Sequence, residues 1–176
     1  VCGQTHQSAH PPTLSARAHA VESQVMDLRE RTQHSHRHPW ETVRAAFFQR
    51  LVRRFAANAA TVVDVGAGDS WFASELLRTS LPSATTVCWD ISYTDSDLAD
   101  WQHPAITRTV TAPQLKADLV VALDVIEHVS DDHEFVVHSL LPLLHQSGVL
   151  IASVPAHQRL FTRHDTALGH HQIGIA

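Results

Sequence analysis

Three residues between positions 64 and 68 have the types and spacing of a ligand-binding turn. Asp64, Gly66 and Gly68 follow the apolar run Thr61–Val63 and precede a segment with helical spacing. Glycine takes positive φ readily and lets a ligand approach the backbone closely. A helix that begins after the turn offers unpaired N–H groups to a polar or acidic ligand. The stretch is therefore predicted to be a buried parallel strand, a glycine turn and a helix N-terminus. A tight turn without a ligand is the alternative.

A second candidate, Asp90, lies 22 residues after Gly68 at the end of the predicted strand 85–90. A carboxylate has two acceptor oxygens and suits the two hydroxyls of a ribose. Ile91 and Tyr93 are then expected to flank the adenosine. An exposed aspartate at the end of a strand, without a ligand, is the alternative. Both an S-adenosylmethionine (SAM) site and an NAD site need this acid, so Asp90 alone does not distinguish them.

Two stretches resemble motifs of class I SAM-dependent methyltransferases. The pattern D-x-G-x-G at 64–68 resembles their motif I, with Ser70 in place of the third glycine. The run ALDVIEHV at 122–129 resembles motif IV of the type 11 and type 12 subgroup. The resemblance implies that Asp64 and the glycine backbone surround the methionine part of SAM. It also implies that Asp124 faces the cofactor or the reacting methyl group.

The segment 154–171 also resembles this subgroup, in the pattern VPA…LF…HD…LGH, which there forms part of the acceptor pocket. His157 and His164, with Asp165, are candidates for a base and its orienting partner. His128 is a further candidate, although it and Glu127 also suit a purely structural bend. Because the chain has 15 histidines, no single one is assigned as the catalytic base.

The elements that position these residues alternate between strand and helix. They predict an α/β fold: a doubly wound, mostly parallel, Rossmann-like sheet of order 3-2-1-4-5. The candidate acids and glycines then meet at the carboxyl ends of the strands. The family's sheet has seven strands, so we expect a C-terminally incomplete domain that lacks the last two. The predicted strands are 61–65, 85–90, 106–112, 118–124 and 149–154.

Two helices are predicted with particular faces and ends. Residues 39–58 form an amphipathic helix whose expected core stripe is Val43, Phe47, Leu51 and Phe55, with Trp40 and Phe48 beside it. This helix is expected either to cover the cofactor site or to pack at the sheet edge. A second helix is predicted after an N-cap at Ser130 and Asp131, ending at Gly148.

Composition limits the function classes. The chain has 176 residues, of which 44% are hydrophobic and 18% charged, and a formal net charge of −5. These values indicate one globular domain and give no support to a nucleic-acid partner. Cys2 and Cys88 are too few for a disulfide framework or a zinc motif. Without a signal peptide or a membrane span, a cytoplasmic protein is expected.

Residues 1–38 are predicted to be a polar, His-rich, partly disordered extension, and residues 39–176 the SAM-binding domain. The alternating histidines at 34, 36 and 38 favour a solvated linker over a metal site, and no metal is predicted. The resemblance implies a SAM-dependent methyltransferase with a small-molecule, lipid or sugar acceptor. One alternative is a truncated, non-catalytic remnant that binds SAM. An NAD-linked enzyme is disfavoured because Trp71 occupies the position of the third fingerprint glycine. The oligomeric state is left open.

Overall fold

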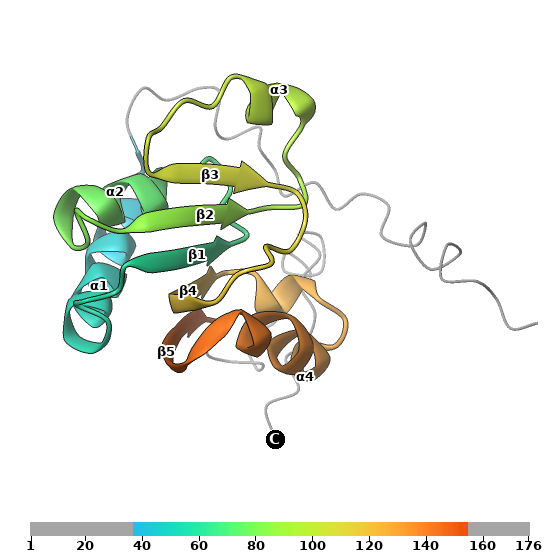
Figure 1. Cartoon of the computed structure of the whole chain (residues 1–176). Coiled ribbons are helices and arrows are strands. Elements are labelled where there is room, and N and C mark those ends of the chain that lie inside the picture. Colours follow the sequence, from blue (N-terminus) through green and yellow to red (C-terminus); the bar gives the residue numbers. More distant parts are fainter. Residues whose placement is uncertain (1–36, 155–176) are drawn as a thin grey trace, which may run out of the picture.

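The structure is a computed structural model that describes residues 37–154 of the chain. Its centre is a parallel sheet in the order β3-β2-β1-β4-β5. The order runs from top to bottom in Figure 1. The predicted fold class and strand order are confirmed. The strands are β1 (Thr61–Val65), β2 (Thr85–Trp89), β3 (Ile106–Thr109), β4 (Ala117–Leu123) and β5 (Leu144–Ser153).

Helices cover both faces of the sheet, because alternate residues of a strand point to opposite sides. On one face, Val62 and Leu119 pack in a core with α1 (Pro39–Phe55) and α2 (Trp71–Thr79). On the other face, Val63 and Val120 pack against the segment that follows β4. That segment contains η3 (Ile126–His128), α4 (Asp132–Phe135), η4 (Val136–Leu140) and η5 (Leu141–Leu143). The short α3 (Asp95–Ala99) follows β2.

Helix α1 is present as predicted, but the predicted core stripe is wrong. Its buried side chains are Ala45, Phe48, Gln49 and Val52, and Leu51 is partly buried beside them. The side chains that are exposed instead are Trp40, Val43, Phe47 and Phe55. Two apolar stripes share this helix, and the sequence pattern alone does not show which of them faces the sheet.

The segment after β4 also differs from the prediction. Asp131 is the N-cap, since its side chain accepts a hydrogen bond from the Glu134 N–H at 2.8 Å. The helix then changes to a π turn and a 3₁₀ turn, and ends before Leu144. Gly148 lies within β5 rather than at a helix end. A Cβ there would lie 2.9 Å from the Ala117 carbonyl oxygen, so this position needs glycine for close strand packing.

The N-terminal boundary of α1 is set by His38, whose side chain accepts a hydrogen bond from the Trp40 N–H. The predicted extension up to residue 36 lies outside the described residues, so its disorder and the division into domains stay predictions. Between residues 37 and 154, no helix is long and apolar enough to cross a membrane.

Candidate functional site

The carboxyl ends of β1, β2 and β4 bring the predicted site residues to one edge of the sheet. Val65 at the end of β1 lies beside Trp89 of β2 and Ala122 of β4. The glycine turn, Asp90 and Asp124 follow these strand ends directly. The Gly68 N–H donates a 2.7 Å hydrogen bond to Asp90 Oδ2, which joins two motifs that are 22 residues apart. The predicted convergence is therefore present, while the binding roles of these residues stay predictions.

The turn needs its glycines for steric reasons. Gly66 and Gly68 have φ of 66° and 53°, in the left-handed region that side chains disfavour. A Cβ on Gly66 would lie 2.3 Å from Val125 Cγ2, directly after the end of β4. The Gly66 N–H donates to the Trp89 carbonyl oxygen at 2.8 Å. The turn is thus fixed against both neighbouring strand ends.

Asp64 carries an acidic group inside the protein. Its residue is 5% exposed, and its Oδ2 makes no hydrogen bond within residues 37–154. Burial, and to a lesser extent the carboxylate of Asp90, raise the pKa of Asp64 to about 7. A buried carboxylate oxygen without a partner is costly unless a donor or a cation reaches it. A hydrogen-bond donor or a cation would therefore satisfy this oxygen.

Asp90 is held in place by its own surroundings. Its Oδ1 accepts from the Ser92 N–H at 2.9 Å and the Ser92 hydroxyl at 2.6 Å, and its Oδ2 accepts from Gly68. A carboxylate has about four lone-pair positions, so roughly one is left for a ligand hydroxyl. Acceptance of two ribose hydroxyls therefore requires the Ser92 side chain to turn away.

The two residues expected beside an adenosine differ in exposure. Ile91 is 74% exposed and offers an apolar surface next to Asp90. Tyr93 is buried, and its Oη lies 2.9 Å from Ser70 Oγ. Tyr93 thus supports the turn from within the core, and Ile91 alone presents a free apolar surface.

Asp124 is engaged by α1 and β5, which the sequence did not indicate. Its φ is 56°. Its Oδ1 accepts a 2.9 Å hydrogen bond from the Ser153 hydroxyl, and its Oδ2 forms an ion pair with Arg44 of α1. Arg44 also donates to Ser153 Oγ at 3.0 Å. In this structure the carboxylate of Asp124 is therefore directed to α1, at the same sheet edge as the glycine turn.

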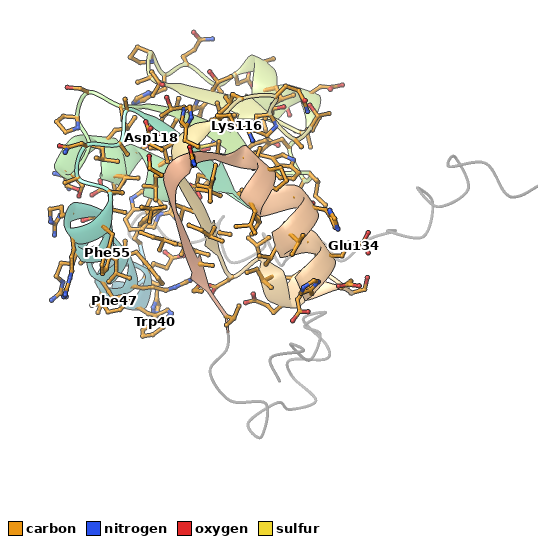
Figure 2. The ribbon with its side chains drawn as sticks, turned by 60° about the horizontal axis from the view of Figure 1, so that its bottom comes forward. Trp40, Phe47, Phe55, Lys116, Asp118 and Glu134 are labelled. Carbon is orange, nitrogen blue, oxygen red and sulfur yellow. The ribbon has the colours of Figure 1, made fainter. Side chains whose placement is uncertain are left out.

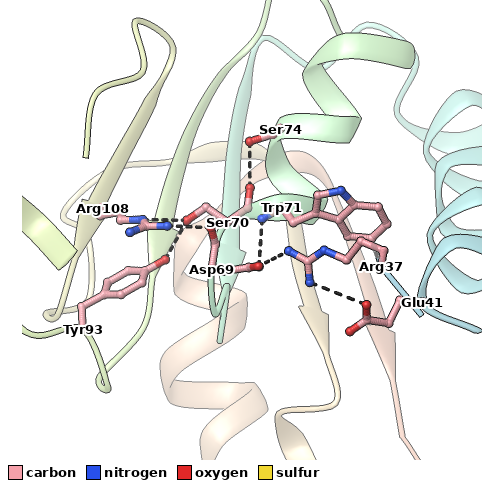
Figure 3. A network of polar contacts seen from close by, with 8 residues as sticks. All are labelled: Arg37, Glu41, Asp69, Ser70, Trp71, Ser74, Tyr93 and Arg108. Atoms are coloured by element: carbon pink, nitrogen blue, oxygen red, sulfur yellow. Dashed lines mark hydrogen bonds and ion pairs between the residues drawn. The ribbon is translucent and has the colours of Figure 1, made fainter. Parts of the chain in front are cut away.

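Two arginines hold residues 69–71 from opposite sides (Figure 3). Arg37 forms an ion pair with Asp69 and lies 4.7 Å from the centre of the Trp71 ring. Arg108 of β3 donates to Ser70 Oγ at 2.9 Å and to the Asp69 carbonyl oxygen at 2.6 Å. These contacts fix the end of the glycine turn and the first residue of α2.

Arg108 itself contacts two aromatic rings. Its guanidinium carbon is 4.9 Å from the ring centre of Tyr93 and 3.8 Å from that of Trp101. Such cation–π contacts add to its hydrogen bonds, so the guanidinium is fixed in position. The arginine ties β3, the loop after β2 and the glycine turn together.

The candidate catalytic histidines are only partly described. His128 lies in η3, close to the carboxyl end of β4, and is partly exposed, whereas its neighbour Glu127 is buried. His157 and His164 lie outside the described residues. Among residues 37–154, no cluster of three or more metal-ligating side chains is present.

The chain matches the family model described as "Methyltransferase domain" over residues 34–172. Among curated proteins, no sequence match was found. The match covers more than half of the chain and includes the glycine turn, Asp90 and Asp124.

Solved structures with the same fold have low sequence identity. The sugar N-methyltransferase KedS8 from a Streptoalloteichus species is 17% identical, with a TM-score of 0.58 over 92% of this chain and 63% of its own. The N-methyltransferase NodS from Bradyrhizobium japonicum is 16% identical, with a TM-score of 0.55 over 75% of each chain. The [4+2]-cyclase SpnF is 15% identical, with a TM-score of 0.51 over 68% of this chain and 48% of its own.

These similarities show the fold and not the reaction, because one fold carries several activities. SpnF is named for a cyclisation, although its fold is shared with the two methyltransferases. The chain spans 63% of KedS8 and 37% of an O-methyltransferase family protein from Burkholderia thailandensis. The whole protein's activity therefore has to be argued from the site.

Proposed function

The chain belongs to the methyltransferase domain family, and on that premise we propose that it transfers a methyl group from SAM to a small-molecule, lipid or sugar acceptor. The observation that carries the proposal is the buried, unpartnered Oδ2 of Asp64 beside the glycine turn and Asp90. SAM combines an ammonium group with a ribose. Asp64 and Asp90 offer acceptors for these two groups at one sheet edge.

Each candidate residue then has a defined task. Asp64 accepts the ammonium of the methionine part, and Gly66 and Gly68 supply the positive φ angles that the turn beside it needs. Asp90 accepts a ribose hydroxyl, and the exposed Ile91 packs against the adenosine. Asp124, whose carboxylate is held by Arg44, borders the site at the end of β4. The subgroup within the family stays a prediction.

The proposed reaction requires little acid–base catalysis by the protein. Bound SAM supplies a methyl group that is already activated by its sulfonium. The protein aligns the acceptor with the methyl–sulfur bond and excludes water. A base is needed only where the attacking oxygen or nitrogen must lose a proton, and His128, His157 and His164 are the candidates. Metal binding plays no part in this proposal.

The acceptor class rests on the resemblance of the segment that follows β5. KedS8 is named as a sugar N-methyltransferase, and a sugar acceptor is compatible with our proposal. An identity of 17% supports the fold alone, so the small-molecule, lipid and sugar classes all enter an acceptor screen.

Calorimetric titration of the chain with S-adenosylhomocysteine (SAH) tests the cofactor site. We expect saturable binding that Asp90→Asn weakens about tenfold to hundredfold, since a hydrogen bond to a charged group contributes roughly 1.5–3 kcal/mol. Asp100→Asn is the matched control, because this exposed aspartate lies at the end of α3. A folded chain that binds no SAH would contradict the proposal, and binding of NADH instead would favour the dinucleotide alternative.

A screen for methyl transfer from labelled SAM separates an enzyme from its alternative. Transfer to any acceptor class supports the proposal. SAH binding without transfer to any of the three classes favours the non-catalytic, SAM-binding alternative.

A further inference from the structure

The outer face of α1 carries an apolar stripe that the fold does not use. Trp40, Val43, Phe47 and Phe55 are 64%, 62%, 52% and 57% exposed. The labelled aromatic side chains of this stripe point away from the rest of the molecule in Figure 2. A contiguous exposed apolar face on a protein usually marks an interaction surface. We refer to these four residues as the outer stripe.

The outer stripe is not a misplaced part of the core. Phe48 and Val52 on the opposite face of α1 are 7% and 0% exposed and pack in the core with Val62 of β1. The anchoring of α1 to the sheet is therefore complete without the outer stripe. Selection for a packed core does not explain three aromatic side chains on the solvent side.

The charges of α1 that lack an ion-pair partner within the described residues are all positive. Arg50, Arg53 and Arg54 are exposed, and none of them forms an ion pair within the described part of the chain. Arg54 lies 5.2 Å from the centre of the Phe55 ring. The one acid of α1, Glu41, is paired with Arg37 at 3.6 Å. The surface thus combines aromatic side chains with unneutralised positive charge.

We propose that the outer face of α1 docks on an anionic lipid bilayer. A helix with Trp and Phe on one side and arginines next to them has the composition of helices that lie in the membrane interface. Aromatic rings enter the boundary between headgroups and acyl chains, and long arginine side chains reach the lipid phosphates. The 17-residue α1 is about 25 Å long and can lie flat on such a surface.

The charge distribution selects this partner over a second copy of the chain. A symmetric dimer places the same patch on both subunits. Packing through the outer stripe would bring the Arg50 and Arg54 side chains of both copies to one interface, where the one acid of α1, Glu41, is already paired with Arg37. The formal net charge of −5 also means that attraction to an anionic surface has to come from this local patch.

Sedimentation with vesicles tests the proposal, which does not depend on the proposed methyl transfer. We expect the full chain to bind vesicles of phosphatidylcholine with phosphatidylserine much more tightly than vesicles of phosphatidylcholine alone. Added salt should weaken this binding. Arg50→Gln and Arg54→Gln should each weaken it about fivefold, since each cation near the surface contributes roughly 1 kcal/mol. Arg78→Gln on α2 is the matched control, because Arg78 is also exposed.

Substitutions of the apolar residues test the outer stripe itself. Trp40→Ser with Phe47→Ser should abolish sedimentation, while Leu141→Ser, at an exposed leucine in η5, should leave it unchanged. Brominated lipids should quench the fluorescence of Trp40. Trp40→Phe should remove the share of the quenching that is due to Trp40, while vesicle binding is kept. Titration of the same variants with SAH tests the cofactor site separately.

Three results would overturn the proposal. The first is binding of equal strength to both kinds of vesicle, or no binding to either kind. The second is a dimer that dissociates on Phe47→Ser, which would assign the outer stripe to a second copy. The third is an outer stripe already covered by another part of the chain, seen as a Trp40 that soluble quenchers reach no better than the partly buried Trp71, Trp89 and Trp101.

Discussion

The protonation of Asp64 makes the stability of the fold depend on the pH of the solution. Its pKa is raised from the ordinary 3.8 to about 7, mainly by burial. Between about pH 4 and pH 7 the carboxyl group of Asp64 therefore keeps its proton in the folded chain, whereas in the unfolded chain it has lost it. The contribution of Asp64 to the stability of the unliganded fold is fully present below about pH 4 and is lost as the pH rises through about 7. Asp64→Asn removes this loss, which is on the order of 4 kcal/mol above pH 7.

The same group predicts how cofactor affinity depends on pH. An ammonium beside Asp64 favours the ionised carboxylate, so binding of SAH has to remove the proton below pH 7. We expect the Kd for SAH to fall roughly tenfold between pH 6 and pH 8, and to change little above pH 8. Calorimetry at several pH values measures this slope.

Asp64→Asn is the control for this prediction. The variant should bind SAH more weakly and with no such slope between pH 6 and pH 8. A Kd in the unmodified chain that is flat over this range would show that Asp64 does not face the ammonium.

The acids and glycines of the site were predictable because they follow apolar runs and because the local backbone restricts which residue types fit there. Gly66 needs positive φ, and Asp90 ends a strand. Arg108 and Arg44 were not predictable, since an arginine in a strand or helix carries no local signal of its partner. Their contacts with Ser70 and Asp124 bridge 38 and 80 positions and exist only in the folded sheet.

At the level of elements, α1 shows why a correct helix can be given the wrong face. Its start follows from Pro39 and its periodicity, but Phe47 and Phe48 are adjacent and both suit a core stripe. The sheet selects Phe48, whose ring meets that of Phe47 edge-on at a centroid distance of 5.3 Å. The end of the segment after α4 was likewise set by pairing of β5 with β4, which places Gly148 in a strand.

Two single substitutions in α1 measure this choice of face. Phe48→Ala should lower the free energy of unfolding by about 3–5 kcal/mol, since Phe48 is 7% exposed and its loss leaves a cavity. Phe47→Ala should change it by less than about 0.5 kcal/mol, since that ring faces solvent. Urea unfolding of both variants gives the comparison, and a reversed order would place the helix on its other face.

At the level of the whole molecule, the strand order was predictable because right-handed crossovers between parallel strands leave few alternatives. That order alone places the ends of β1, β2 and β4 side by side, so residues from 64 to 124 form one site. The ion pairs Arg37–Asp69 and Arg44–Asp124, which join α1 and the segment just before it to this edge, were not predictable, because each links residues far apart in the sequence.

A ligand that joins these strand ends should stabilise the domain as a unit. SAH at about one hundred times its Kd adds roughly 2.7 kcal/mol to the free energy of unfolding. For a chain of this size the melting temperature should rise by about 5–10 °C. Asp90→Asn should show a smaller rise at the same SAH concentration, and NADH should produce none.

Because β1, β2 and β4 are hydrogen-bonded neighbours, circular dichroism of the backbone and fluorescence of the tryptophans should report the same shift in melting temperature. Equal shifts with SAH and NADH would show instead that the site recognises only the shared adenosine. Asp64 and its ammonium partner would then have no place in the mechanism.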